Sequence, residues 1–307
     1  MNKKRHKLRL RKQVVMCIPV LLIITIVTTG IIINKSGILS NEVAASSVFT
    51  SKKATTDEKQ LSDLEYFKSF SEMIEKRQKD NTIIYYAQTF KLDVEKTLSI
   101  AHQYTNNYKD EEFNKNFIIG PSSVKKKIGS LKNFEAGVVY FVRDLYRYPE
   151  KYGSSIEEIR TDETPTLKTK SSDGNIYMDN GLTFEQYVGK ICDLFEMDKA
   201  TVLAISYQEA GIKTSGLFKY SNNIGGHRGY DGWMKYTTLE AGVIAHVISI
   251  KAMQDNYDLD LSTYGGLSAL SGIYVNGNTA KPQQSWIEKV TIFKNQINEK
   301  DLFTIKE

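Results

Sequence analysis

Apolar residues recur at three- and four-residue spacing along most of the chain, which is the spacing of one face of an α-helix. The pattern is clear in 61–78 (LSDLEYFKSFSEMIEKRQ). Residues 93–104 and 198–209 each begin with an Asp suited to an N-cap, followed by an apolar stripe at helical spacing. Two further stretches, 135–148 and 240–257, are strongly apolar and predict buried helices. We therefore predict a mainly α fold.

Two polar stretches interrupt this periodicity. Residues 35–60 are rich in Ser, Thr and Lys and predict a tether. Residues 161–181 contain Pro, Gly, Ser and Asp, which favours a linker between domains, and within it GNIYMDNG is the best candidate for a short hairpin. The sequence thus predicts two folded domains, 61–160 and 182–307.

The two predicted domains resemble each other at one fixed offset of 105 residues, as between Asp93 and Asp198. The register holds without a gap over about sixty residues, which chance matches would not do. The shared positions are mostly apolar or Gly, as expected for a common core. The pattern therefore predicts an internal duplication. Matched pairs include Phe90 with Phe195, Leu98 with Leu203, Ile100 with Ile205, Gln103 with Gln208, Phe113 with Phe218, Gly120 with Gly225, Glu135 with Glu240 and Tyr152 with Tyr257.

The amino-terminal segment predicts a membrane anchor. Residues 1–12 hold seven of the 41 Lys and Arg residues and no acid, and 14–33 follow with twenty uncharged, mostly apolar residues. That length spans a bilayer as a helix, so the lipid bilayer is an expected partner and 13–34 the expected anchor. The basic flank orients the amino terminus towards the cytoplasm and the rest outwards. The alternative is a cleavable signal peptide with a site at Val43-Ala44-Ala45.

Charge and cysteine usage narrow the functional classes. Beyond residue 12 the chain is close to neutral, which argues against nucleic acid as a partner. Cys17 lies in the predicted anchor and Cys192 in a predicted helix, so they are not expected to pair. The four histidines lack ligand spacing, so we expect no metal site and no cofactor.

The two repeats differ around one acid. Glu209 stands where the first repeat has Tyr104, and the polar residues that follow Glu209 are likewise absent from the first repeat. Ser215 takes the place of Asp110, and Asn222-Asn223 the place of Phe117-Ile118. A solvated Glu at a helix end gives no reason for its neighbours to change with it. The second repeat therefore carries the candidate chemistry.

The pattern Glu209-Ala210-Gly211-Ile212-Lys213-Thr214-Ser215, then Asn222-Asn223-Ile224-Gly225-Gly226, resembles that of the lysozyme-like glucosaminidases of glycoside hydrolase family 73. It is more distantly similar to that of the soluble lytic transglycosylases. The segment SGIYVNG is similar to the one in which these families keep an active-site tyrosine, which implies a role for Tyr274. Trp286 is near the position of a second family aromatic. The resemblance implies a lysozyme-like fold and peptidoglycan glycan strands as the substrate.

A glycosidase needs a carboxyl that stays protonated near neutral pH to protonate the leaving oxygen. Glu209 follows an apolar helix, where desolvation and the helix C-terminus both raise a carboxyl pKa, so we expect it to be the general acid. Asp231 is the candidate second carboxylate. Glu240 is a poorer one, because Glu135 matches it in the other repeat. The alternatives are the substrate's N-acetyl group, or its 6-hydroxyl as in lytic transglycosylases.

Further residues of the second repeat are candidates for substrate binding. Ser215 is expected to orient Glu209, and the Asn pair to shape its loop. His227 and Arg228 are expected to contact a substrate acid or peptide stem. The tryptophans are candidates for stacking on sugar rings. His246 and Cys192 are expected in the core. The full set of candidate substrate-binding residues is Ser215, Asn222, Asn223, Gly225, Gly226, His227, Arg228, Trp233 and Trp286.

The sequence thus predicts a membrane-anchored, outward-facing peptidoglycan hydrolase with a degenerate first repeat and a catalytic second one. The first repeat is expected to extend the glycan groove or to bind a membrane or cell-wall protein. A lytic transglycosylase is the nearest alternative. Another is a non-catalytic module that binds glycan or scaffolds a cell-wall assembly.

Overall fold

The computed structural model describes residues 56–307 except 129, 163, 212, 230–231, 275–279, 301 and 305–307. The predicted cytoplasmic tail, the anchor 13–34 and nearly all of the tether 35–60 lie outside these residues. Within them, none of the helices combines the length and the hydropathy needed to cross a bilayer.

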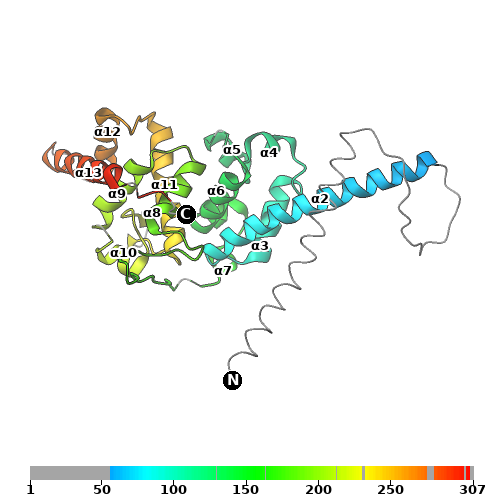
Figure 1. Ribbon diagram of the computed structural model, residues 1–307, viewed down its shortest axis with the longest axis horizontal. Coiled ribbons are helices and arrows are strands. Elements are labelled where there is room, and N and C mark those ends of the chain that lie inside the picture. Colours follow the sequence, from blue (N-terminus) through cyan, green and yellow to red (C-terminus); the bar gives the residue numbers. More distant parts are fainter. Residues whose placement is uncertain are drawn as a thin grey trace, which may run out of the picture. The chain divides into compact units, whose positions relative to one another are not determined.

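The described chain is mainly helical, as the periodicity predicts (Figure 1). Its first half contains α2 (Thr56–Thr89), α3 (Val94–Thr105), α4 (Glu111–Asn116), α5 (Ser122–Ile128), α6 (Phe134–Arg147), the 3₁₀ helix η1 (Pro149–Tyr152) and α7 (Ile156–Ile159). Its second half contains α8 (Phe184–Leu194), α9 (Lys199–Ala210), α10 (Gly216–Ser221), β1 (Arg228–Gly229), β2 (Gly232–Trp233), α11 (Leu239–Tyr257), α12 (Tyr264–Tyr274) and α13 (Ala280–Lys300).

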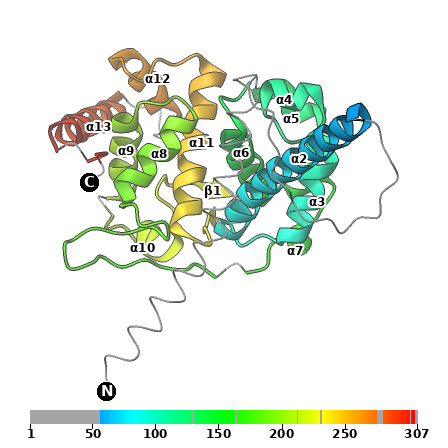
Figure 2. The same ribbon diagram turned by 45° about the vertical axis from the view of Figure 1, so that its right-hand side comes forward.

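Asp63–Glu307 form one compact unit. Figures 1 and 2 show α6 and α11 side by side at its centre, with the other helices of each half on either side. Arg143 Nη2 donates to Ser249 Oγ at 3.2 Å, and the Tyr146 hydroxyl donates to the Lys235 carbonyl at 3.1 Å. The two halves thus share an interface with polar contacts as well as buried side chains.

The segment predicted as a linker between them, 161–181, packs on the second half. The Thr166 amide donates to the Thr237 carbonyl at 2.7 Å, and Ile176 and Met178 are buried. Its expected hairpin is reduced to a turn with one bridge, Tyr177 to Thr183. The only two-stranded sheet of the described residues, β1–β2, lies instead within the Gly-rich stretch after α10.

The elements of the two halves repeat at the same offset as the sequence. The bounds of α3 and α9, of α4 and α10, and the starts of α6 and α11 are each shifted by that offset. Side chains in matching positions cap the helices: Asp93 and Asp198 accept from the first turns of α3 and α9. Gly137 and Gly242 also match, because a Cβ on either would overlap a carbonyl oxygen, that of Phe117 or Asn222.

Helix α2 extends beyond what its pattern predicts. Its apolar residues Tyr66, Phe67, Phe70 and Met73 are exposed, although their spacing predicts a buried face. The core begins further along the helix, at Ile83 and its neighbours. Helical spacing therefore locates α2 correctly but does not tell which of its turns are covered.

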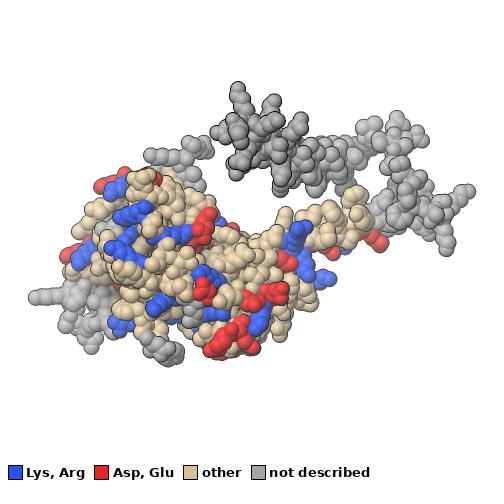
Figure 3. Space-filling view, turned by 90° about the horizontal axis from the view of Figure 1, so that it is seen from below, with Lys and Arg blue, Asp and Glu red and all other residues tan. Residues whose placement is uncertain are grey.

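Charges of both signs are mixed on the face shown in Figure 3, among the described residues. Ion pairs among the described residues include Lys199 with Asp193 at 2.8 Å and Lys294 with Asp198 at 2.7 Å. The distribution agrees with the near-neutral charge of the sequence beyond residue 12.

Candidate functional site

Glu209 lies in the last turn of α9. The helix is buried on most of its length, and it ends because Gly211 adopts a left-handed conformation, φ +56°, as its C-cap. This ending leaves Glu209 half-buried at the carboxyl end of an apolar helix. The position is the one expected from the sequence.

The carboxyl of Glu209 is held by Trp286 of α13. The indole Nε1 donates to Glu209 Oε1 at 2.7 Å, and the Trp286 side chain is itself buried. Burial raises the pKa of Glu209 above its ordinary value, and the Trp286 hydrogen bond opposes this in part. The site therefore favours a protonated carboxyl with one oxygen already engaged.

Tyr274, at the end of α12, packs beside this pair. Its ring stacks on that of Trp286 with centroids 5.8 Å apart. Burial raises the pKa of Tyr274, and the nearby Glu209 charge raises it further. The Tyr274 hydroxyl is buried with no hydrogen-bond partner among the described residues, so it is available to a group that enters the site.

Gly226 lies beside the second carboxyl oxygen of Glu209. A Cβ there would come within 3.1 Å of Glu209 Oε2 and 3.9 Å of the Trp233 ring, and its φ of +62° also favours Gly. Trp233, on β2, is 47% exposed, and the Arg228 guanidinium lies 4.3 Å from its ring centroid. The structure thus brings together Glu209, Gly226 and a partly exposed Trp233 ring, over which Arg228 lies.

Asn223 holds the loop that carries these residues. Its amide Nδ2 donates to the carbonyls of His227 at 2.8 Å and Met234 at 2.9 Å, and its Oδ1 accepts from the His227 amide at 2.9 Å. Asn223 is itself fully buried. It therefore shapes the loop, as expected, and lies behind the site.

His227 differs from its expected role on an exposed loop. Its ring is buried against His246, and its Nδ1 lies 2.7 Å from the Tyr236 hydroxyl. Burial lowers the pKa of His227, and burial lowers that of His246 to about 4. The histidine is buried because Gly225 lets both rings approach the backbone: a Cβ there would overlap them.

Ser215 and Asn222 also serve the scaffold. Ser215 is the N-cap of α10, where Oγ accepts from the Phe218 amide at 3.2 Å, so it is not bonded to Glu209. Asn222 is buried, and its Nδ2 donates to the carbonyls of Thr166 and Tyr236. Both residues keep the loop in place and are engaged with protein groups.

Of the two candidate second carboxylates, Asp231 lies outside the described residues. Glu240 is buried; it accepts from the Asp179 amide at 2.8 Å and pairs with Lys168 at 3.1 Å. Its counterpart Glu135 accepts from the Tyr86 hydroxyl at 2.6 Å. Glu135 also pairs with Lys190 of α8 at 3.2 Å, so both glutamates hold segments of the fold together and are engaged with protein groups.

The first half closes the corresponding place with aromatic rings. Tyr104, which matches Glu209, packs edge-on against Tyr152 with centroids 5.8 Å apart. The Tyr152 hydroxyl donates to Asp144 at 3.1 Å. The first half therefore has a packed aromatic pair at the position where the second half has an acid.

One polar cluster next to Glu209 was not predicted from the sequence. Tyr207 and Lys213, which flank Glu209 along the chain, both bind the carboxylate of Glu185 on α8. The matching positions of the first half hold Asp80, His102 and Tyr108, which are also polar and also contact one another. Polar residues at all three positions of both repeats are the sequence signal for this cluster.

Comparison of the chain with protein-family models, with curated proteins and with solved structures gives no match. Within the described residues, no three or more His, Cys, Asp or Glu side chains are grouped so as to hold a metal ion.

Proposed function

We propose that the second half is a peptidoglycan hydrolase, an endo-β-N-acetylglucosaminidase, with Glu209 as its general acid. The observation that carries the proposal is the state of that carboxyl. It is half-buried, its pKa is raised, and one of its two oxygens is bonded to Trp286. The resemblance to family 73 glucosaminidases supplies the substrate class.

The geometry favours Glu209 Oε2 as the oxygen that carries the proton. Oε1 accepts the hydrogen bond from Trp286, whereas Oε2 faces Gly226, which has no side chain. A glycosidic oxygen seated beside Gly226 would take this proton as its bond to the anomeric carbon breaks. The exposed ring of Trp233 would bind the face of an adjoining sugar, and Tyr274 would hydrogen-bond to the substrate or to water.

The second chemical step separates two outcomes. Asp231 would take a proton from the water that attacks the anomeric carbon. Alternatively, the N-acetyl oxygen of the substrate would bond to that carbon first, and water would then displace it. Either route yields a reducing N-acetylglucosamine end. Attack by the sugar's 6-hydroxyl would yield a 1,6-anhydro end, the product of a lytic transglycosylase. Mass spectrometry of the released fragments distinguishes the two products.

We further propose that the halves arose by duplication of a lysozyme-like helical domain. The shared element bounds and the matched glycines support this. In the first half, Tyr104 takes the place of the acid. We therefore propose that the first half binds glycan or a protein of the envelope. With residues 14–33 as an anchor, the active half would cut glycan outside the membrane.

Zymography of the purified protein tests the proposal. We predict that Glu209→Gln abolishes clearing of a peptidoglycan gel, a loss of at least about a hundredfold, because Gln cannot deliver a proton. Glu196→Gln, at an exposed glutamate of the same half, is the matched control and should clear like the unmodified protein.

Clearing by Glu209→Gln would remove the acid from the mechanism. Absence of clearing by the unmodified protein, together with binding to purified glycan, would instead favour the non-catalytic module.

A further inference from the structure

Three side chains beside Glu209, those of Glu185, Tyr207 and Lys213, form the Glu185 cluster. The Tyr207 hydroxyl donates to Glu185 Oε1 at 2.7 Å, and Lys213 Nζ forms an ion pair with the same oxygen. The charged side chains are nearly buried, with 7% of the Glu185 side chain exposed and 10% of that of Lys213. A charge this deeply buried is strongly destabilising without its partner, so the contacts of the cluster constrain the positions of all three residues.

The cluster holds the chain on both sides of Glu209. Tyr207 lies two residues before it in α9, and Lys213 lies four residues after it, beyond the Gly211 cap. Both are tied to one carboxylate of α8, while Glu209 is tied to Trp286 of α13. The end of α9 is thus held between two neighbouring helices.

The first half builds the same cluster from different residues. The Asp80 cluster consists of Asp80, His102 and Tyr108, the residues that match Glu185, Tyr207 and Lys213. Both His102 Nε2 and the Tyr108 hydroxyl lie 2.7 Å from Asp80 Oδ1. In both halves, therefore, one carboxylate joins the last turn of the helix to the loop after it.

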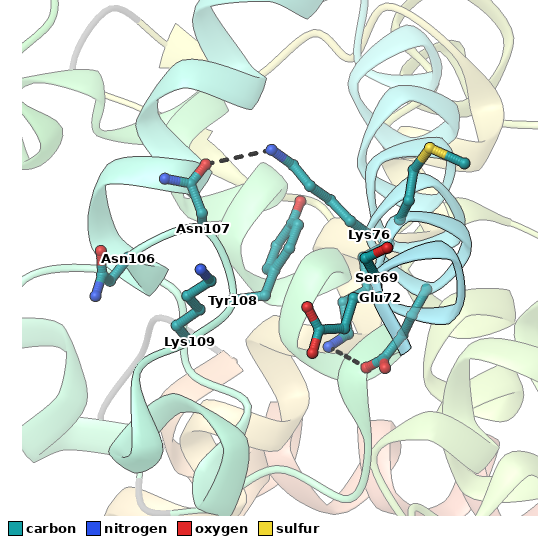
Figure 4. A pocket seen from close by; sticks show the side chains of 10 residues that line it. Ser69, Glu72, Lys76, Asn106, Asn107, Tyr108 and Lys109 are labelled. Carbon is teal, nitrogen blue, oxygen red and sulfur yellow. Dashed lines mark hydrogen bonds and ion pairs between the residues drawn. The ribbon is translucent and has the colours of Figure 1, made fainter. Parts of the chain in front are cut away.

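Backbone and ring contacts repeat as well. Tyr108 and Lys213 both have left-handed backbones, with φ of +67° and +65°. Lys79 Nζ lies 5.4 Å from the Tyr108 ring, and Lys213 Nζ lies 5.2 Å from the Phe184 ring, so cation and ring have exchanged places between matching positions. Figure 4 shows Tyr108 between its loop and α2. The arrangement is thus kept although every residue type has changed.

We infer that the Glu185 cluster positions Glu209, by fixing the last turn of α9 and the loop after it so that the carboxyl stays against Trp286 and out of water. The inference deepens the proposed function, since it concerns the same carboxyl. It makes Tyr207 and Lys213 positioning residues that act through Glu209.

A fluorescence titration tests this without substrate. In a Trp233→Phe background, the emission of Trp286 reports ionisation of the carboxyl bonded to its indole, and Glu209→Gln should remove that step. We expect Tyr207→Phe and Lys213→Met each to move the midpoint down towards the ordinary value of a glutamate, because a displaced Glu209 gains water and burial outweighs the Trp286 bond that is lost with it. Loss of the Lys213 charge alone would move the midpoint up, so the direction identifies the cause.

Tyr108→Phe, which breaks the corresponding bond of the Asp80 cluster, is the matched control and should leave the midpoint unchanged. An unchanged or raised midpoint in both folded Glu185-cluster variants would overturn the inference.

If those variants fail to fold, a combined variant that copies the cluster residues of the first half tests the inference. Its substitutions are Phe184→Lys, Glu185→Asp, Tyr207→His and Lys213→Tyr. A midpoint close to that of the parent supports positioning, and a folded protein with a lowered midpoint contradicts it. The single variants could lower the midpoint even if the unmodified protein clears no peptidoglycan. That result would support the positioning role and contradict only the proposed function.

Discussion

At the scale of single residues, Glu209 and Trp286 form the contact with the most direct chemical consequence. The indole N–H stabilises the ionised carboxyl, while burial stabilises the neutral one, and burial is the larger effect. The pKa of Glu209 is therefore set by two opposing influences, of which one can be removed by a single substitution.

We predict that Trp286→Phe shifts the alkaline limb of the pH–activity profile upwards by about one unit. The variant loses a hydrogen bond to the ionised form, which is worth about 1.5 kcal/mol or more, and 1.36 kcal/mol corresponds to one unit of pKa. Because a general acid must be protonated, a higher pKa extends activity to higher pH. The measurement is the rate of peptidoglycan turbidity loss across pH.

Trp233→Phe keeps the bond to Glu209 and is the control, so its limb should stay in place. A Trp286→Phe profile that coincides with the parent profile would mean that this carboxyl does not set the limb.

At the scale of elements, the close contact between α11 and the end of α10 depends on a missing side chain. A Cβ on Gly242 would overlap the carbonyl oxygen of Asn222, and a Cβ on Gly137 would overlap that of Phe117. At both glycines the helix contacts the backbone of the preceding loop with no room for a methyl group. The contact between α11 and the end of α10 therefore lies at the same position as that between α6 and the end of α4.

We predict that Gly242→Ala lowers the free energy of unfolding by about 1–3 kcal/mol, the usual cost of overpacking. Gly272→Ala is the control, because its Cβ would approach nothing closer than 3.8 Å and Ala favours a helix by up to about 1 kcal/mol. Urea unfolding followed by circular dichroism measures both. A Gly242→Ala protein as stable as the control would show that the backbones separate easily.

Many features of the helices and of their burial could be predicted from the sequence. Local signals sufficed for the helices, for the Asp93 and Asp198 caps and for the burial of Cys192 and His246. The repeat comparison directed attention to Glu209 because the shared core acts as an internal reference.

Contacts between distant segments were not predictable from local patterns. The spacing of Tyr66 and Phe67 predicts a covered face, but whether another element lies there depends on the whole fold. In the same way, His227 is followed by polar residues and reads as exposed, yet Gly225 allows its ring to pack against His246. Tyr207 and Lys213 meet Glu185 only because α8 and α9 pack together.

At the scale of the whole molecule, the two halves share more than a linker. Besides the α6–α11 contact, Thr238 Oγ1 donates to the Thr89 carbonyl at 2.7 Å, and the Tyr146 and Tyr236 rings lie 6.2 Å apart. Polar and aromatic contacts therefore tie the end of α2 and of α6 to the segment that precedes α11.

We predict that Asp63–Glu307 unfold in a single cooperative transition, because separation of the halves would expose both central helices to water. Differential scanning calorimetry of the protein measures this, and the calorimetric and van't Hoff enthalpies of this transition should agree. Two transitions, each with the enthalpy of about half the residues, would show that the halves are independent domains.

The aromatic pair of the first half bears on how such a molecule can change over time. Tyr104 packs edge-on against Tyr152 at the end of α3, and this ring contact contributes to folding. A carboxylate introduced at position 104 alone would lose that contact and would be destabilising by itself. The cost of losing this contact disfavours the return of an acid at position 104, so the aromatic pair tends to keep the two halves different.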